Sequence, residues 1–170
     1  ISIGLVGSEM CIRDRNRSES PSFGHAQMVD VQCGKEVRII NPCNLSGCSI
    51  GDHSFIGPFV EIQSKASIGK NSRIQSHCFV CSLVEIGDSC FVGHGVTFVN
   101  DLFKDGKPSK DERDWLPTKI GNEVSIGSGS TILPVKICDG CVVGAGSVVV
   151  RDLTVRGVYA GNPAKLIREI

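Results

Sequence analysis

Hydrophobic residues return at every sixth position through the middle of the chain, and a turn-forming residue, often glycine, follows most of them. The first run holds its register at nine positions: Ile50, Ile56, Ile62, Ile68, Ile74, Val80, Ile86, Val92 and Phe98. Two places before each of these lies a second, mostly small series: Cys48, Ser54, Val60, Ala66, Ser72, Cys78, Val84, Cys90 and Val96. A helix repeats its apolar face at about 3.6 residues and a half-buried strand at 2, so neither explains the spacing. The pattern predicts short strands that bend and start again, each placing one large and one small residue inside.

The register resumes after a gap and continues almost to the end of the chain. It covers Ile120, Ile126 and Ile132, slips by one residue, and continues at Ile137, Val143 and Val149. Upstream, three residues lie six apart but out of phase with the first run by one residue: Val31, Val37 and Cys43. They predict one further, irregular coil. Hexapeptide repeats of this kind form β-helices, whose stacked coils bury a core that no single repeat could bury alone.

The repeats resemble the left-handed parallel β-helix of the hexapeptide acyltransferase superfamily, in which three hexads make one triangular coil. The handedness follows from the resemblance and not from the spacing. We therefore expect an all-β fold, a left-handed parallel β-helix (a hexapeptide-repeat solenoid) with an external loop and a short C-terminal tail. Residues 28–170 are expected to form this domain, with the loop inserted at 99–119.

The first 27 residues are expected to lie outside the domain, as a non-native or disordered leader and linker. The opening stretch, residues 1–15, resembles a sequence that recurs at the ends of unrelated translations and comes from sequencing adaptor. It is a poor secretory signal, because Glu9 interrupts its apolar part and no lysine or arginine precedes that residue. Residues 16–27 are polar and typical of a linker.

Composition excludes several classes of protein. The chain has 18 basic and 18 acidic residues, so nothing in its charge suggests a nucleic-acid groove or an anionic membrane surface. Seven Phe, one Trp and one Tyr are too few for platforms that stack single-stranded nucleic acid. No apolar run approaches the roughly 18 residues of a membrane span. A soluble protein without a nucleic-acid partner is expected.

Nine cysteines include two CxxC pairs, Cys78 with Cys81 and Cys138 with Cys141. A zinc ribbon would separate its pairs by about 15–20 residues, and these pairs lie much further apart. Four cysteines hold the small inward position of the repeat and are expected to be buried: Cys48, Cys78, Cys90 and Cys141. The remaining cysteine of each CxxC pair, Cys81 and Cys138, holds a turn position and is expected to be exposed. Reduced thiols without a secretory signal favour a cytoplasmic location.

The gap in the repeat holds a charged segment between Phe98 and Ile120. Positions 101–118 contain nine charged residues together with Phe103, Trp115 and Pro117. Solenoids place insertions on one face, often the binding face, although a solvated loop is the simpler alternative. A lone tryptophan in a charged loop needs a surface to cover it, and we expect a neighbouring subunit or a ligand to do so.

The residues suited to chemistry precede this loop: His77, His94, Asn100 and Asp101. His94 follows His77 by 17 residues, one short of a coil of 18. We therefore expect the two histidines on the same edge, one layer apart and pointing outward. His53 precedes His77 by 24 residues and is expected on a different edge, while His25 falls in the leader.

Three stretches carry a closer resemblance: "IQSHCFVCSLVEIGDSCFVGHGVTFVNDLF" at 74–103, "VSIGSGSTILPVKICDGCVVGAGSVVVRDL" at 124–153 and "GVYAGNPAKLIREI" at 157–170. Together they resemble acetyl-CoA-dependent N-acetyltransferases that act on nucleotide-linked 3-amino sugars in bacterial surface-polysaccharide and lipopolysaccharide synthesis, such as UDP-2-acetamido-3-amino-2,3-dideoxyglucuronate N-acetyltransferase. The resemblance implies a homotrimer with active sites between subunits. It also implies acetyl-CoA as co-substrate and no required metal.

The resemblance assigns roles to residues by position. Asn100 matches the asparagine beside the sugar's amino group, and Gln75, Asp101 and Trp115 are expected to bind the nucleotide sugar. Three coil-edge residues match positions along the pantetheine arm of CoA: Gly127, Ala145 and Gly146. Lys165 or Arg168 lies where a tail cation approaches the CoA phosphates, which suits the charge-assisted pairing of cations with phosphate. Relatives often lack histidine at the positions of His77 and His94, so the resemblance does not supply the base.

The chemistry leaves two routes for the proton. Acetyl transfer to an amine needs a neutral nitrogen, an acceptor for its proton and donors for the oxyanion. In the first route His94 or His77 accepts the proton, because the pKa of an unperturbed histidine lies near neutrality. In the second route the departing CoA sulfur accepts it.

Three alternatives remain open, and two of them belong to other functional classes. An O-acetyltransferase of a sugar or small alcohol uses the same donor. A non-catalytic β-helix scaffold would use the loop only to bind a protein. A γ-type carbonic anhydrase shares the fold but needs three zinc histidines, and the spacing of His53, His77 and His94 does not place them on one edge.

Overall fold

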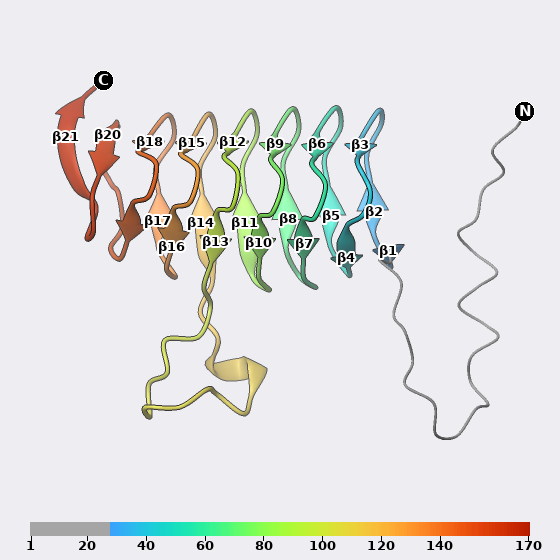
Figure 1. Ribbon diagram of the computed structural model, residues 1–170, viewed down its shortest axis with the longest axis horizontal. Helices are drawn as coiled ribbons and strands as arrows, with labels where there is room; N and C mark the ends of the chain where they lie inside the picture. The colour runs from blue at the N-terminus through green and yellow to red at the C-terminus, as the bar shows by residue number, and fades with distance from the viewer. Residues whose placement is uncertain (1–27) are drawn as a thin grey trace, which may run out of the picture.

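The computed structural model describes residues 28–170, so the expectations for the leader and for His25 lie outside the described residues. The chain winds as a left-handed parallel β-helix whose coils stack in a row, from the coil of β1–β3 to the C-terminal hairpin (Figure 1). Strands in successive coils pair in parallel, and this arrangement generates three sheets. The predicted fold is confirmed.

Each of the three sheets forms one face of the solenoid. Sheet A contains β1 (Met28–Val29), β4 (Asn44–Ser46), β7 (Glu61–Ile62), β10 (Phe79–Val80), β13 (Thr97–Phe98), β16 (Thr131–Ile132) and β19 (Val148–Val149). Sheet B contains β2 (Gln32–Cys33), β5 (Ser49–Ile50), β8 (Ser67–Ile68), β11 (Val84–Ile86), β14 (Thr118–Ile120) and β17 (Lys136–Ile137). Sheet C contains β3 (Arg38–Ile39), β6 (Phe55–Ile56), β9 (Arg73–Ile74), β12 (Phe91–Val92), β15 (Ser125–Ile126), β18 (Val142–Val143), β20 (Gly157–Ala160) and β21 (Lys165–Glu169).

Turns at the corners make three edges, named here by the sheets that they join. The A–B edge contains residues 63–66, 81–83, 99–117 and 133–135. The B–C edge contains residues 51–54, 69–72, 87–90, 121–124 and 138–141. The C–A edge contains residues 57–60, 75–78, 93–96, 127–130 and 144–147. These edges decide which side chains can act together.

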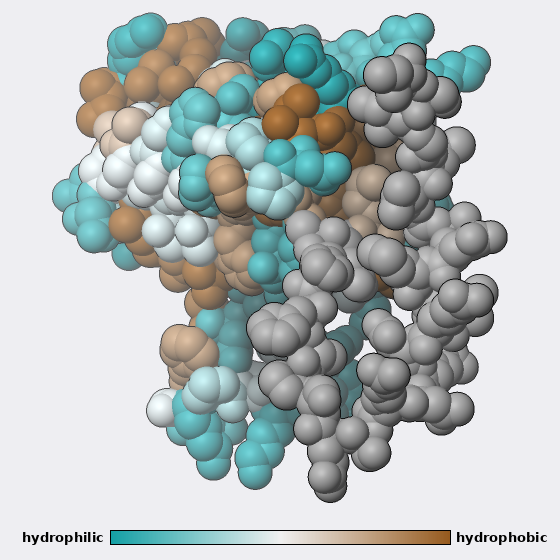
Figure 2. Space-filling view, turned by 45° about the vertical axis from the view of Figure 1, so that its right-hand side comes forward, coloured by the Kyte–Doolittle hydropathy of each residue, from teal (hydrophilic) through white to brown (hydrophobic). Residues whose placement is uncertain are grey.

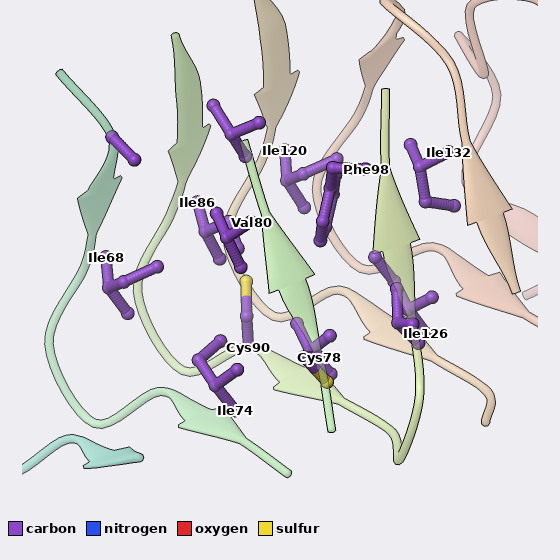
Figure 3. Packing of buried hydrophobic residues seen from close by; sticks show 14 of the residues in the cluster. Ile68, Ile74, Cys78, Val80, Ile86, Cys90, Phe98, Ile120, Ile126 and Ile132 are labelled. Atoms are coloured by element: carbon purple, nitrogen blue, oxygen red, sulfur yellow. The ribbon is translucent and has the colours of Figure 1, made fainter. Parts of the chain in front are cut away.

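The repeating hydrophobic residues fill the space between the three sheets. Every large residue of the two predicted runs, from Ile50 to Phe98 and from Ile120 to Val149, is at most 4% exposed. Figure 3 shows these side chains pointing inward from successive coils. The nine small residues of the second series are buried as well. Burial of large and small residues in alternation gives each coil the same inward shape, so the coils stack in register.

The first described coil has a register that differs from the predicted one. Cys33, Ile39 and Leu45 pair with Ile50, Ile56 and Ile62 of the next coil. Val31, Val37 and Cys43 therefore hold the small position, two residues before the large one. The irregular coil is confirmed, and the phase slip lies between Leu45 and Ile50, which are five residues apart.

Burial corrects one cysteine prediction. Cys48, Cys78, Cys90 and Cys141 are buried as expected. Cys81 was expected to be exposed but is only 2% exposed, because its turn leads directly into the buried strand β11. Cys138 is half-buried.

Side chains along the B–C edge join the coils. The carboxylate of Asp52 accepts the backbone N–H of Lys35, Asp88 accepts that of Lys70, and Asp139 accepts that of Asn122, each at 2.7 Å. The repeated aspartate in the turn is therefore a structural feature, since it pairs a backbone donor of the preceding coil.

The external loop leaves the A–B edge between Phe98 and Thr118 and projects from one side of the solenoid (Figures 1 and 2). It contains one short 3-10 helix, η1 (Glu112–Asp114). Thr118 and Lys119, which were assigned to the insertion, belong to β14. Within residues 28–170, no helix is long and apolar enough to cross a membrane.

Candidate functional site

His77 and His94 both lie on the C–A edge, one coil apart, and both side chains are exposed. His77 follows β9 and His94 follows β12, so each lies in the turn that leads from sheet C to sheet A. The backbone N–H of Gly95 donates to Ser76 O, which places His94 beside Ser76 and not directly over His77. The predicted placement of the two histidines is confirmed.

Two serines hold His94. Its Nδ1 lies 2.8 Å from the Oγ of Ser76, in the coil before. Its backbone N–H donates to the Oγ of Ser128, in the coil after, at 3.1 Å. Of its two ring nitrogens, Nδ1 has a protein partner, and the exposed side chain presents Nε2 outward.

His77 and His53 have different surroundings. The ring of His77 stacks on Phe59 of the coil before, with centroids 4.8 Å apart. His53 lies on the B–C edge, where its Nδ1 is 3.1 Å from a carboxylate oxygen of Glu36. The three histidines therefore do not converge. Among residues 28–170, no cluster of three or more His, Cys, Asp or Glu side chains is placed to hold a metal ion.

Beyond His94 the C–A edge loses its bulky side chains. Gly95, Gly129 and Gly146 occupy the same turn position in successive coils, all with φ between 66° and 69°. That position holds Phe59 and His77 in the two coils before. A Cβ added at any of the three glycines would meet no atom within 4 Å. A smooth strip of backbone thus runs from His94 toward the C-terminal end, with the exposed Ala145 beside it.

Gly127, in contrast, is required by stacking. A Cβ at this position would lie 2.4 Å from the backbone nitrogen of Ala145 in the next coil, so only glycine allows this approach. Gly127 and Ala145 are therefore in contact on the edge where both were expected.

The C-terminal tail closes the same edge. Val148 N donates to Gly161 O at 3.0 Å, and Ala164 N donates to Val148 O at 2.8 Å. Lys165 begins β21 directly after this turn and is exposed. Arg168 lies three residues further along β21, opposite Val158, and is also exposed. Of the two predicted cations, Lys165 therefore lies nearer the glycine strip.

Asn100 lies on a different edge from the histidines. It follows β13 at the A–B edge, whereas His94 precedes β13 at the C–A edge. Its side-chain Nδ2 donates to the backbone carbonyl of Ser82 at 3.2 Å. Its backbone carbonyl accepts the N–H of Leu116 at 2.9 Å. Asn100 thus closes the base of the loop, and its side-chain amide has a fixed direction.

The carboxylate of Asp101 organises the loop. It accepts the backbone N–H groups of Ser109 at 2.7 Å and Phe103 at 2.9 Å, and the hydroxyl of Ser109 at 3.0 Å. The Ser109 and Phe103 amides lower the pKa of Asp101 below its ordinary value. The predicted role of Asp101 in substrate binding stays a prediction, because the contacts that the structure gives it are internal to the loop.

Trp115 is half-buried at the end of η1, close to the base of the loop. Three other apolar residues of the loop, Leu102, Phe103 and Leu116, are each between 45% and 55% exposed. Lys65 Nζ, on the solenoid, lies 3.0 Å from a carboxylate oxygen of Glu112. A cavity of about 770 Å³ lies within the loop and is lined by side chains of both charge signs. The loop therefore presents apolar surface that its own chain leaves uncovered.

The structure brings most of the predicted site together but divides it over two edges. The C–A edge carries Gln75, His77, His94, Gly127, Ala145, Gly146 and, at its end, Lys165. The A–B edge carries Asn100, Asp101 and Trp115. Sequence reasoning missed Ser76, Ser82 and Ser128, which hold His94 and Asn100. The available signal was their spacing, since Ser76 and Ser82 each precede their partner by 18 residues, one coil.

Comparison with known proteins identifies the same hexapeptide repeat. The family described as bacterial transferase hexapeptide (six repeats) matches residues 47–82, and the hexapeptide repeat of succinyl-transferase matches residues 117–151. The chain is 33% identical to galactoside O-acetyltransferase of Escherichia coli strain K12, over all of this chain and 87% of that protein.

Solved structures share the fold. A mutant of AntD, an N-acyltransferase from Bacillus cereus in complex with dTDP and coenzyme A, is 26% identical over 81% of this chain and 83% of that one, with a TM-score of 0.65. A galactoside acetyltransferase in complex with coenzyme A is 30% identical over 71% of this chain and 64% of that one, with a TM-score of 0.61. PerB of Caulobacter crescentus, at 22% identity and a TM-score of 0.61, is longer, and this chain spans 55% of it.

Three observations indicate the same family: the hexapeptide repeat, the three-sided solenoid and the extent of the match to the Escherichia coli protein. This chain belongs to the hexapeptide-repeat acyltransferases.

Proposed function

We propose that the protein is an acetyl-CoA-dependent N-acetyltransferase that acts on the amino group of a nucleotide-linked amino sugar. The observation that carries the proposal is the pairing of two features. One is a bare glycine strip that begins at His94 and ends at Lys165, and the other is the fixed amide of Asn100 at the base of the loop. The strip suits a long, narrow thioester, and the amide of Asn100 suits the sugar that accepts the acetyl group.

The strip has the length and chemistry of a site for the CoA arm. Coils repeat at about 4.8 Å, so the layers from His94 through Ser128 and Ala145 to the tail turn span roughly 14 Å. Exposed backbone along this strip can pair with the amide groups of pantetheine. Lys165 at its end supplies a cation for the phosphates. The AntD relative, with its bound coenzyme A, supports this use of the fold.

The division of the site supports an assembly with active sites between subunits. His94 and Asn100 lie at opposite ends of β13, on two different edges of one chain. Both can reach one acceptor if the C–A edge of one subunit faces the A–B edge and loop of the next. A head-to-tail contact of this kind closes into a ring, and three copies are the proposed number. The exposed Leu102, Phe103 and Leu116 give the loop an apolar surface for that contact.

In the proposed reaction the lone pair of the sugar nitrogen attacks the thioester carbonyl carbon. A C–N bond forms, the C–S bond breaks, and the nitrogen loses one proton. His94 is the proposed acceptor of that proton through Nε2, because Ser76 holds its Nδ1. Backbone N–H groups of the edge stabilise the oxyanion, and the proton passes finally to the thiolate of CoA.

The direction of Asn100 suits an amine as the group that accepts the acetyl. Its Nδ2 is engaged by Ser82, so Oδ1 is the side-chain atom that can contact the sugar that accepts the acetyl group. An amide oxygen accepts an N–H from an amine and so turns the nitrogen lone pair toward the thioester. The dTDP in the AntD relative supports a nucleotide-linked substrate.

O-acetylation of a sugar is the second candidate. The 33% identity with galactoside O-acetyltransferase favours it, and a histidine held by a serine also suits a hydroxyl, which needs a base more than an amine does. The two candidates share the donor and differ only in the acceptor atom.

Incubation with acetyl-CoA and a panel of UDP- and dTDP-linked amino sugars tests the proposal. The panel varies the position of the amine and the group at C6, and matched sugars carry a hydroxyl in place of the amine. Thiol release with one amino sugar, and an acetamide in the product by NMR, is the expected result. Release with hydroxyl sugars alone would move the assignment to O-acetylation. No turnover and no binding of CoA would favour the scaffold.

A further inference from the structure

Cys138 and Cys141 face each other across one turn of the B–C edge, far from the glycine strip. Their Sγ atoms lie 3.3 Å apart. The turn joins β17 to β18, and Gly140 within it has a φ of 67°. The first and fourth Cα atoms of a β-turn lie within about 7 Å, and disulfides join Cα atoms roughly 4.4–6.8 Å apart. The sulfurs need to approach by only about 1.2 Å to reach the bond length of a disulfide.

The second CxxC pair lacks this geometry despite the same spacing. Cys78 and Cys81 lie at the two ends of strand β10, and both are 2% exposed. The Cys78 thiol donates to Gly93 O at 3.0 Å. An extended strand keeps the two sulfurs apart, whereas the turn at 138–141 brings its pair together. Proximity is therefore a property of this turn and not of the motif.

Cys138 can be reached from solvent. It is half-buried and lines a cavity of about 390 Å³ together with Lys119, Lys136, Asp152 and Leu153. Two lysines and one aspartate form the rim of the cavity, and Lys119 Nζ is paired with a carboxylate oxygen of Glu85 at 3.2 Å. The carboxylate of Asp152 is engaged by the backbone N–H of Lys136 at 2.8 Å. The exposed side chain of Lys136 is therefore the cation of the rim that can pair with a carboxylate of a small molecule.

Cys141 lies behind Cys138 and is fully buried. Burial, and then the hydrogen bond with Cys138, raise the pKa of the Cys141 thiol to about 11. Its sulfur also contacts the carbonyl of Val155 at 3.5 Å. Cys141 is placed to attack the sulfur of Cys138 in a mixed disulfide but not to meet a reagent from solvent.

We propose that Cys138 and Cys141 form a thiol–disulfide exchange site for small disulfides that bear carboxylates. Cys138 attacks one sulfur of the external disulfide, so that an S–S bond breaks, one external thiol leaves and a mixed disulfide forms. Cys141 then attacks the Cys138 sulfur and releases the second external thiol. The two protons of the protein thiols pass to the two departing thiolates, so one external disulfide becomes two thiols and the protein gains one disulfide.

The test uses the full chain and oxidised glutathione, followed by intact mass and a non-reducing peptide map. A background Cys11→Ser/Cys33→Ser removes Cys11, which lies outside the described residues, and the exposed thiol of the first described coil. We expect the mass to fall by two hydrogens and one peptide pair to carry a Cys138–Cys141 disulfide. In the same background Cys141→Ser should retain one glutathione on Cys138, and Cys138→Ser should give neither product.

The charge of the rim is tested separately. Lys136→Glu should slow the reaction with oxidised glutathione severalfold and speed the reaction with cystamine, a cationic disulfide, because rim charges act on association rates. The proposal is overturned if the folded Cys11→Ser/Cys33→Ser chain keeps Cys138 and Cys141 alkylatable after exposure to oxidised glutathione. A stable glutathione adduct on Cys138, with Cys141 still reduced, would overturn it as well.

Discussion

The hydroxyl oxygen of Ser76 lies 2.8 Å from Nδ1 of His94, which is one coil further along the solenoid. In the tautomer with a proton on Nδ1, that nitrogen donates to the serine oxygen and Nε2 keeps its lone pair. Because Ser128 also holds the backbone N–H of His94, the imidazole is fixed from both neighbouring coils. Stacking of coils thus determines which ring nitrogen is paired within the protein and which one is left for a ligand.

Replacement of His94 tests its proposed role as the base. His94→Ala should lower kcat by about 10²- to 10⁴-fold, the usual loss when a general base is removed. His53→Ala, on the B–C edge, is the matched control and should leave kcat unchanged. If the double variant His77→Ala/His94→Ala stays within about tenfold of the unmodified protein, the CoA sulfur takes the proton instead.

Ser76 is a positioning residue, and its replacement should have a smaller effect. A neutral hydrogen bond contributes about 1 kcal/mol, so Ser76→Ala should lower kcat about fivefold and leave the KM for acetyl-CoA unchanged. Ser76→Thr, which keeps the hydroxyl, should restore the rate. An equal loss in the alanine and threonine variants would indicate disturbed packing of the turn. The measurement is initial rates over a pH series.

Much of the fold is present in the spacing of single residues. Ile74 and Val92 are separated by 18 positions, and they stack as partners in β9 and β12. Periodicity predicts this contact because the coils between Ile50 and Phe98 have the same length. Periodicity gives the wrong inward residues in the first described coil, where the register shifts. It also gives the wrong exposure for Cys81, whose burial depends on the direction of the next strand.

The candidate site was predictable to the extent that it follows the same period. His77, His94 and the glycine strip share one edge because turn positions repeat in each coil. The contacts of Asp101 with Ser109 and Phe103 were not predictable, because the loop has no repeat. No edge was predicted for Asn100, although counting coil corners would have separated it from His94, because one strand, β13, lies between them.

The loop should lose order at acidic pH through Asp101. Hydrogen bonds from Ser109 and Phe103 lower the pKa of this carboxyl, so its contribution is complete above the ordinary Asp pKa of about 3.9 and is lost as the pH falls through the lower, folded value. The protection of loop peptides, measured as exchange corrected for the pH dependence of intrinsic exchange, should therefore be constant down to about pH 4 and fall below it. Asp101→Asn should raise exchange at neutral pH. Asp111→Asn, which affects η1, should leave Phe103 and Ser109 protected.

A bulky side chain on the glycine strip should block the donor. Ala145 is exposed beside Gly146, so Ala145→Trp can fold while it fills the strip. We expect the KM for acetyl-CoA to rise at least about tenfold, since one lost anchoring contact of roughly 1.4 kcal/mol gives that factor. Lys70→Trp, at the corresponding turn position of the B–C edge, is the control. If both variants changed the KM for acetyl-CoA equally, the glycine strip would not be the CoA site.

Mixed assemblies test whether His94 and Asn100 act from different subunits. They lie at the two ends of β13, on separate edges of one chain. His94→Ala and Asn100→Ala should each be nearly inactive alone. If one subunit supplies His94 and the next supplies Asn100, random co-assembly of the two variants in equal amounts restores about a quarter of the sites, because each site then needs one specific ordered pair. A mixture that is re-assembled from separated subunits should regain this activity, while a mixture that is never dissociated should not. If both residues served the same site from one chain, every site would lack one of them, and no activity would return.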